Sequence, residues 1–191
     1  MSTVFLLKGV KLTINKGVFS PNPGKTNSTL MLLNNMPDVK GKDILDMGCG
    51  SGVIGIFCAL NGAMHVVAAD VDKRAVENAK ENATINKVAR IVQVVKSDLF
   101  KNIKGRFDFV FGNLPIVDSE WDLGVSTIVL LKKFVSGCRQ HIRKDGQAFF
   151  TWNSESDVSD VISFLLEGKY TFTQVAEKRN GITWYLFKIY F

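Results

Sequence analysis

The sequence predicts an α/β fold built around a mostly parallel, doubly wound sheet. Three observations support this prediction. Short apolar runs alternate with amphipathic helical patterns from residue 43 to residue 168. Alternate glycines, which allow a sharp strand-to-helix turn, follow the first of these runs. Asn180-Gly181, the strongest hairpin signal in the chain, reverses one strand near the end. We therefore expect seven strands in the order 3-2-1-4-5-7-6, one of them antiparallel.

These patterns also predict the individual elements. Residues 3–14 are expected to form two short strands or a hairpin, and residues 27–35 a short helix. The sheet strands are expected at residues 44–45, 66–69, 91–95, 107–111, 149–152, 171–176 and 182–191. Further helices are expected at 53–60, after Asp72, at 126–144 and at 158–166. Arg143 and Lys144, followed by Gly146, are typical of a helix end.

Length and composition narrow the class of protein. The 191 residues, 46% of them hydrophobic, suffice for one α/β domain, so we expect a single domain over 1–191 with residues 1–40 as an N-terminal cover segment. No apolar run reaches the ~18 residues of a membrane helix and no signal-peptide pattern is seen, so we expect a cytoplasmic protein. Three cysteines without a CxxC pair and only two histidines argue against disulfides and a metal site. The net charge of +6 favours an anionic partner such as RNA.

The stretch 43–55 is the centre of the predicted site. Its strand runs into Asp46, and a helix starts directly after the alternating glycines. Such a turn lets a ligand lie on the main chain at the amino end of a helix, where nucleotide-like cofactors bind in open α/β sheets. Residues 50–55 also match the GxGxxG dinucleotide signature, but a carboxylate at Asp46 would repel a pyrophosphate and suit a cation. A glycine-rich turn without a ligand is the third interpretation.

Asp70 marks the end of the second sheet strand. A carboxylate at this position can accept hydrogen bonds from both hydroxyls of a ribose. Val71 would then lie near an adenine ring. Asp72 is better explained as the N-cap of the next helix than as a second ribose ligand.

The order of Asp46, Gly48, Gly50 and Gly52 resembles motif I of the class I SAM-dependent methyltransferases. From residue 17 onward the chain is similar to their HemK/PrmC/Mtq-like and RsmC-like branches, the methyltransferase small domain. The resemblance implies a Rossmann-like fold and S-adenosylmethionine (SAM) as cofactor. It also implies that Asp46 holds the methionine ammonium, directly or through water, above a floor shaped by the glycines.

The same resemblance assigns roles to three further segments. Asp98 would accept from the adenine amino group and Leu99 would pack on the ring, although Asp98 also suits an ordinary turn. Residues 17–21 are similar to a segment that closes over the cofactor, or they cover the sheet edge. Trp121 and Gly124 fall where the branch has a glycine-rich stretch.

The loop after the fourth strand departs from a motif of the family. Asn-Pro-Pro-aromatic marks methyltransferases that act on planar nitrogens, and its Asn side chain and next carbonyl accept hydrogens from the target NH2. Here Asn113 and Pro115 match, whereas Leu114 and Ile116 replace a proline and the aromatic residue. Pro115 restricts Leu114 to extended backbone, so the Leu114 carbonyl can keep its role. The missing ring removes stacking worth about 1–3 kcal/mol on a base.

These motifs predict a SAM-dependent methyltransferase that acts on a nitrogen of a macromolecule. A glutamine side-chain amide of a translation-related protein is the favoured acceptor, because Ile116 offers no ring for a flipped base. A ribosomal or transfer RNA base is the alternative that the positive charge favours. A non-catalytic SAM-fold binding module is a further alternative. Some compact members of the branch work with a small partner subunit, so an activating partner protein is also considered.

Overall fold

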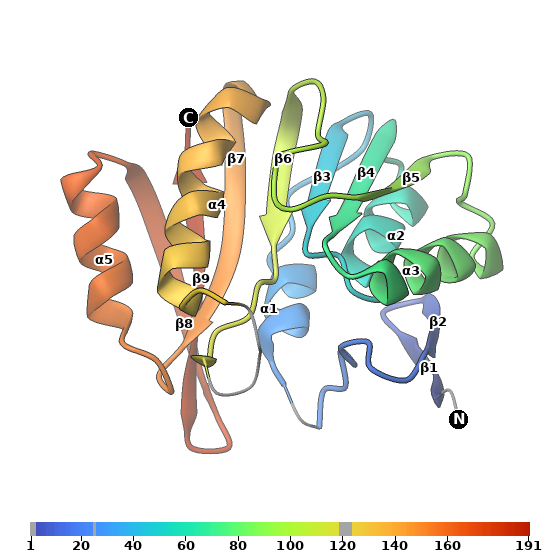
Figure 1. Ribbon diagram of the computed structural model, residues 1–191, viewed down its shortest axis with the longest axis horizontal. Coiled ribbons are helices and arrows are strands. Elements are labelled where there is room, and N and C mark those ends of the chain that lie inside the picture. Colours follow the sequence, from blue (N-terminus) through green and yellow to red (C-terminus); the bar gives the residue numbers. More distant parts are fainter. Residues whose placement is uncertain (1–2, 25, 119–123) are drawn as a thin grey trace.

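The computed structural model describes residues 3–24, 26–118 and 124–191. Its sheet has seven strands in the order β5-β4-β3-β6-β7-β9-β8 (Figure 1). The strands are β3 (Asp43–Met47), β4 (His65–Asp70), β5 (Val92–Lys96), β6 (Phe107–Gly112), β7 (Ile142–Asn153), β8 (Thr171–Arg179) and β9 (Ile182–Tyr190). Of these seven strands, β9 alone runs opposite to the other six, so the predicted order and the single reversed strand are confirmed.

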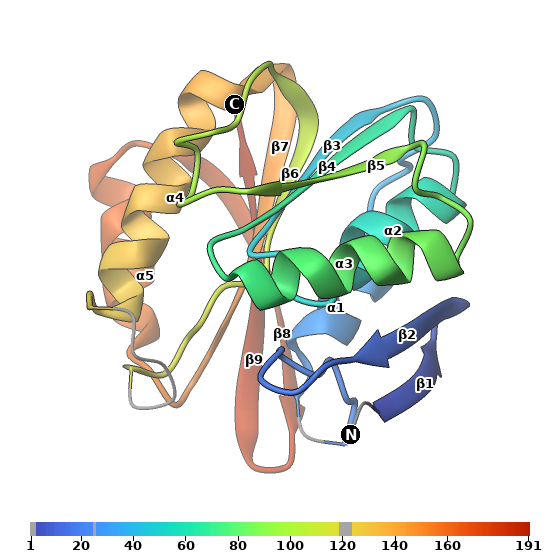
Figure 2. The same cartoon turned by 45° about the vertical axis from the view of Figure 1, so that its right-hand side comes forward.

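Helices cover both faces of this sheet. They are α1 (Ser28–Asn34), α2 (Val53–Leu60), α3 (Lys73–Ile85), α4 (Thr127–His141) and α5 (Val158–Glu167). Figures 1 and 2 show α1, α2 and α3 on one face and α4 and α5 on the other. None of the helices in the described part of the chain is long and apolar enough to cross a membrane.

The two central strands carry the core and determine where the loops emerge. Ile44 and Leu45 in β3 and Val110 and Phe111 in β6 are all fully buried, as expected for parallel strands covered on both faces. Met47 at the end of β3 pairs with Ala69, one residue before the end of β4, and with Gly112, the last residue of β6. The loops after these three strands therefore emerge side by side.

The end of α4 differs from the prediction. The helix ends at His141 and β7 begins at Ile142, whereas the sequence predicted a helix to residue 144 and a strand from residue 149. The reason is tertiary: the Arg143 guanidinium pairs with Asp43 at 2.5 Å and with Asp108 at 2.7 Å, at the starts of β3 and β6. Gly146 lies within β7, where a Cβ would come within 2.9 Å of the Asp108 carbonyl. Its small size serves strand packing rather than a helix stop.

A separate hairpin, β1 (Thr3–Leu7) and β2 (Val10–Ile14), is bound to α3 through side-chain amides. Three α3-side asparagines, four residues apart, accept N–H bonds from alternate residues of the β2 segment: Asn86 from Lys11 at 2.9 Å, Asn82 from Thr13 at 2.8 Å and Asn78 from Asn15 at 3.3 Å. The spacing fits because four helical residues rise about 6 Å and two strand residues about 6.7 Å. These asparagines thus take the place of a partner strand.

Asn82 extends this contact to the glycine-rich turn. Its Nδ2 donates to the Thr13 carbonyl at 3.0 Å and to the Ser51 carbonyl at 2.9 Å, and the residue is fully buried. Replacing Asn82 by leucine is expected to lower the free energy of unfolding in urea by about 3 kcal/mol, because buried groups left unpaired cost about 1–3 kcal/mol each. The more exposed Asn86→Leu is the matched control. Equal losses in the two variants would contradict the special role of Asn82.

The C-terminal hairpin forms as predicted and extends beyond the sheet. It turns at Asn180-Gly181, with φ of 52° and 81° as the tight hairpin turn requires. Figure 1 shows its tip reaching past the ends of the other strands. There Arg179 donates to the Asn27 side chain at 3.1 Å, and Asn27 donates to Glu177 at 3.1 Å. The hairpin thus helps to hold the start of α1 in place.

Candidate active site at the carboxyl edge of the sheet

A cavity of about 980 Å³ opens at the carboxyl ends of the central strands. Its volume lies in the upper part of the range typical of small-molecule sites. The predicted site residues that line it are Gly48, Gly50, Asp70, Val71, Asp98, Leu99, Asn113, Leu114 and Pro115. Asp46 and Gly52 are not among the lining residues. The fold therefore brings most of the predicted site residues to one cavity. The positions of Asp46 and Gly52 have physical explanations.

The glycine-rich turn forms one wall of the cavity. Gly48, Gly50 and Gly52 have φ of 69°, 52° and 80°, in the left-handed region that favours glycine. A Cβ at Gly48 would lie 2.9 Å from a side-chain carbon of Leu114, so this turn and the loop after β6 are in close contact. A Cβ at Gly52 would instead lie 3.0 Å from Ala79 of α3. Gly52 is thus required for helix packing and does not face the cavity.

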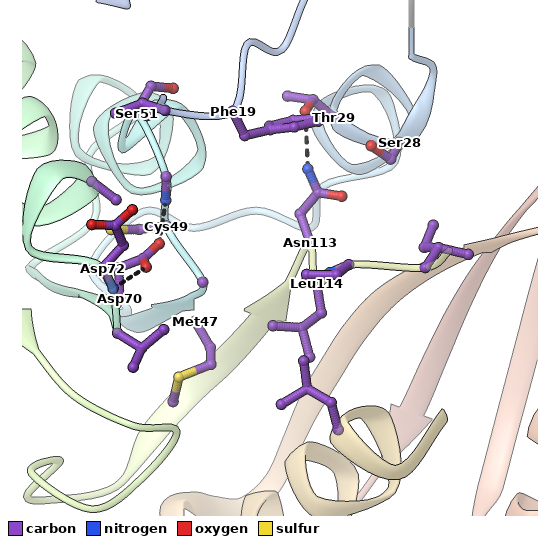
Figure 3. Close-up of a pocket in the computed structure, with 18 of the residues that line it drawn as sticks. Phe19, Ser28, Thr29, Met47, Cys49, Ser51, Asp70, Asp72, Asn113 and Leu114 are labelled. Carbon is purple, nitrogen blue, oxygen red and sulfur yellow. Dashed lines mark hydrogen bonds between the residues drawn. The ribbon is translucent and has the colours of Figure 1, made fainter. Parts of the chain in front are cut away.

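Asp70 is held in a fixed position at the cavity wall (Figure 3). One carboxylate oxygen accepts from the Gly50 N–H at 2.8 Å and the other from the Asp72 N–H at 2.9 Å. A carboxylate has about four acceptor positions, so each oxygen can still accept a bond from a ligand hydroxyl. Burial raises the pKa of Asp70, although these two backbone bonds act in the opposite direction.

Asp72 caps α3, in agreement with the preferred interpretation. Its carboxylate accepts from the Arg74 N–H at 2.9 Å and pairs with the Arg74 guanidinium at 2.7 Å. The side-chain bond to Arg74 lowers the pKa of Asp72. The Asp72 carboxylate therefore serves the helix cap and the ion pair with Arg74.

Asp46 does not line the cavity, so the structure does not support a direct contact with the methionine ammonium, and a contact through water stays a prediction. The residue is fully buried behind the turn. One oxygen accepts from the Gly55 N–H at 2.9 Å, while the other has no hydrogen-bond partner among the described residues. The strand alternation explains this, because Asp46 points to the face that α2 covers. Asp46 thus fixes the first turn of α2, and burial raises its pKa to about 7.

A pH dependence of stability follows from Asp46. Between its ordinary pKa of 3.8 and about 7, the folded protein keeps a proton on Asp46 that the unfolded chain has released. This contribution to the free energy of unfolding is full below pH 3.8 and is lost as the pH rises through about 7. Asp46→Asn should remove this part of the slope in urea titrations at several pH values. Parallel pH profiles for the two proteins would contradict the assignment.

The turn after β5 presents Asp98 and Leu99 to the cavity. Leu99 has φ of 45°, and the Ser97 hydroxyl supports this turn by donating to the Leu99 carbonyl at 2.6 Å. Asp98 is exposed, and Val71 on the opposite loop is 58% exposed. An exposed apolar side chain and an exposed carboxylate that line the same cavity can face a flat ring with an amino group.

Two hydroxyl groups fix the loop after β6. The Ile116 carbonyl accepts from the Thr127 hydroxyl at 2.8 Å and from the Ser156 hydroxyl at 2.7 Å. Ile116 itself is buried, whereas Asn113 and Leu114 are partly exposed to the cavity. The predicted role of Trp121 falls outside the described residues.

Sequence reasoning left several lining residues out of the predicted site. Phe19 lies on the wall, and its Cβ would be 3.9 Å from a Cβ at Gly50. The segment that carries it packs on α3, since a Cβ at Gly17 would lie 2.7 Å from the Arg74 guanidinium. Residues 17–20 all line the cavity, which favours the cofactor-covering interpretation of this segment over a simple cover of the sheet edge. Thr29, also on the wall, had no sequence signal.

The residues present fit the cofactor that the motifs imply. Gly48 and Gly50 place no Cβ between their backbone and the cavity, and the fixed Asp70 carboxylate has acceptor positions left for ribose hydroxyls. Val71 and Leu99 add apolar surface near Asp98. These groups suit the sugar and the adenine of SAM.

Comparisons with known proteins agree with this site. A family model described as methyltransferase small domain matches residues 9–186. A Methanocaldococcus jannaschii protein, provisionally named a protein N5-glutamine methyltransferase, is 32% identical over 73% of this chain and 74% of its own length. A ribosomal RNA small subunit methyltransferase C from Photobacterium profundum is 29% identical over 84% of this chain, which spans only 46% of that protein.

Solved structures share the fold. A methyltransferase complexed with SAH superimposes over the full length of this chain and 56% of that chain, with a TM-score of 0.80 and 16% identity. A T. thermophilus 16S rRNA N2 G1207 methyltransferase, in complex with AdoMet and guanosine, covers 97% of this chain and 49% of its own, with a TM-score of 0.73 and 23% identity. The chain therefore belongs to the methyltransferase small domain family and is a SAM-dependent methyltransferase.

Proposed function

We propose that this chain transfers the methyl group of SAM to a nitrogen of a macromolecule. The observation that carries the proposal is the contact between the glycine turn and the loop after β6. Gly48 lies against Leu114, and Asn113 lines the same cavity as Asp70. A cofactor on the turn and an amino group at Asn113 would thus be neighbours. We also propose that residues 1–191 act as one domain, with residues 1–40 as its cover.

SAM, when bound, supplies a methyl group that is already electrophilic. The protein then needs mainly to position the acceptor, and good positioning alone can contribute several kcal/mol to catalysis. In the proposal, the Asn113 side chain and the Leu114 carbonyl each accept one hydrogen of the target NH2. These bonds increase the availability of the nitrogen lone pair and direct it toward the cofactor side of the cavity. Asp70 and the glycine turn hold the cofactor, and Asp46 supports α2 from behind.

A glutamine side-chain amide of a translation-related protein is the acceptor that we favour. The M. jannaschii relative, which this chain matches over most of its length, supports an amide acceptor. Ile116 is buried where the family motif has an aromatic residue, so that position offers no ring for a base. An RNA base is the second candidate, supported by the net charge of +6 and by the similarity to the ribosomal RNA methyltransferase.

Methyl-labelled SAM separates these acceptors. The purified chain is incubated with an unmodified peptide-chain release factor and, separately, with unmodified ribosomal RNA. Label in the protein that amide hydrolysis releases as methylamine supports the first proposal, and label in a nucleoside supports the second. SAM binding by calorimetry without label in any macromolecule would contradict both and favour the non-catalytic binding module.

The proposal includes a location with the translation apparatus in the cytoplasm, as the names of several relatives suggest. A small activating partner remains a prediction. The apolar side chains of Val4 and Leu6, 72% and 65% exposed on β1, mark the surface where such a partner should be sought.

A further inference from the structure

The amide of Asn113 is held at both of its ends. Its Nδ2 donates to the Thr29 hydroxyl at 3.1 Å, which Figure 3 shows as a dashed line, and its Oδ1 accepts from the Thr151 hydroxyl at 3.0 Å. Thr29 is 1% exposed and Thr151 is 2% exposed. Two buried hydroxyl groups therefore fix the one side chain that the proposed chemistry requires.

The two threonines come from distant parts of the chain. Thr29 lies in α1, 84 residues before Asn113, and Thr151 lies in β7, 38 residues after it. Helix α1 packs against β7, so both hydroxyls come within hydrogen-bond distance of the amide that follows β6. The first of them belongs to the N-terminal cover segment, which thus contributes to the acceptor end of the cavity.

The two threonine bonds leave the Asn113 amide with one free acceptor position. A hydroxyl group can donate or accept, so the threonine pair can hold the amide plane in either assignment of its oxygen and nitrogen. With the oxygen toward Thr151, Oδ1 keeps one lone pair for a further donor. One free acceptor position, in a plane that cannot rotate, is what an incoming N–H requires.

We propose that Thr29 and Thr151 are positioning residues that hold the Asn113 amide in the plane needed to accept a hydrogen of the target NH2. This inference rests on the proposed function, since it assigns a purpose to a fixed Asn113. Neither threonine touches the acceptor in this account; both act through Asn113. The N-terminal segment is then part of the catalytic arrangement as well as a cover.

Valine substitutions test the proposal, because valine keeps the shape of threonine and removes the hydroxyl. Thr29→Val and Thr151→Val are each expected to lower kcat for methyl transfer about ten- to a hundredfold, the range for losing one buried hydrogen-bond partner. The KM for SAM should stay the same. Thr29→Ser and Thr151→Ser should restore most of the rate. Thr84→Val, which removes a hydroxyl bond to the Lys80 carbonyl far from the cavity, is the matched control.

A second measurement separates this inference from the proposed function. The side-chain NH2 signals of Asn113 in a ¹⁵N spectrum, identified by their loss in Asn113→Ala, should shift and exchange faster with water in both valine variants. Unchanged signals, or wild-type kcat in both variants, would overturn the positioning role. A fall in SAM affinity that serine does not restore would show a purely structural role and also overturn it. If wild-type protein labels neither the release factor nor the RNA, the proposed function fails. The spectrum still decides whether Thr29 and Thr151 hold the Asn113 amide in place.

Discussion

Replacing Asn113 by alanine is expected to lower kcat for methyl transfer by about a hundredfold or more, the usual effect of removing one preorganised polar group at a reacting centre. The physical reason is that the target NH2 loses the acceptor that aligns its lone pair, while the Thr151 hydroxyl loses the side-chain oxygen to which it donates. Asn113 directly follows β6 and lines the cavity on the wall opposite Asp70. SAM binding, measured by calorimetry, should therefore change little.

Asn61→Ala is the matched control, because Asn61 is the C-cap of α2 and its side chain donates locally, to the Phe57 carbonyl at 2.8 Å. It should keep the wild-type rate. An Asn113→Ala protein that transfers methyl groups at the normal rate would remove the basis of the proposed mechanism. An Asn113→Ala protein that binds its macromolecular partner unchanged, while wild type shows no transfer, would instead favour the binding module.

The sequence predicts correctly those parts of the fold that depend on residues close together in the chain. The glycine turn, the helix after it and the Asn180-Gly181 hairpin each depend on residues adjacent in the chain, and each was found where expected. The end of α4 depends on Arg143 meeting two aspartates that lie at the starts of β3 and β6. Only the assembled sheet brings these charges together, so the local basic residues were misread as a helix end.

The same distinction explains the errors in the predicted site. Asp70 is the last residue of β4 and Asn113 directly follows β6, and the parallel pairing of these strands with β3 makes their positions predictable. Asp46 lies one position before the strand end, and its side chain therefore points to the covered face. Thr29 and Thr151 have no local pattern at all. Their role depends on α1 packing against β7, which no spacing in the sequence indicates.

Replacing Asp70 by alanine is expected to weaken SAM binding by at least about a hundredfold, because hydrogen bonds to a charged group contribute about 1.5–3 kcal/mol each and a ribose offers two. The variant also leaves the Gly50 and Asp72 N–H groups without their carboxylate partner, so the glycine turn loses its anchor. Calorimetric titration with SAM, at a temperature where circular dichroism shows the variant folded, measures the effect.

Two isosteric variants distinguish the ribose contact from the anchor. Asp70→Asn keeps one side-chain oxygen for the turn but loses the charge, so its affinity should fall between those of wild type and alanine. Asp72→Asn, two residues on, preserves the helix cap and should bind SAM nearly as wild type does. Because burial raises the pKa of Asp70, wild-type affinity should decline as the pH is lowered and approach that of Asp70→Asn. A pH-independent affinity, or equal losses at both aspartates, would show that the Asp70 carboxylate does not bind the cofactor.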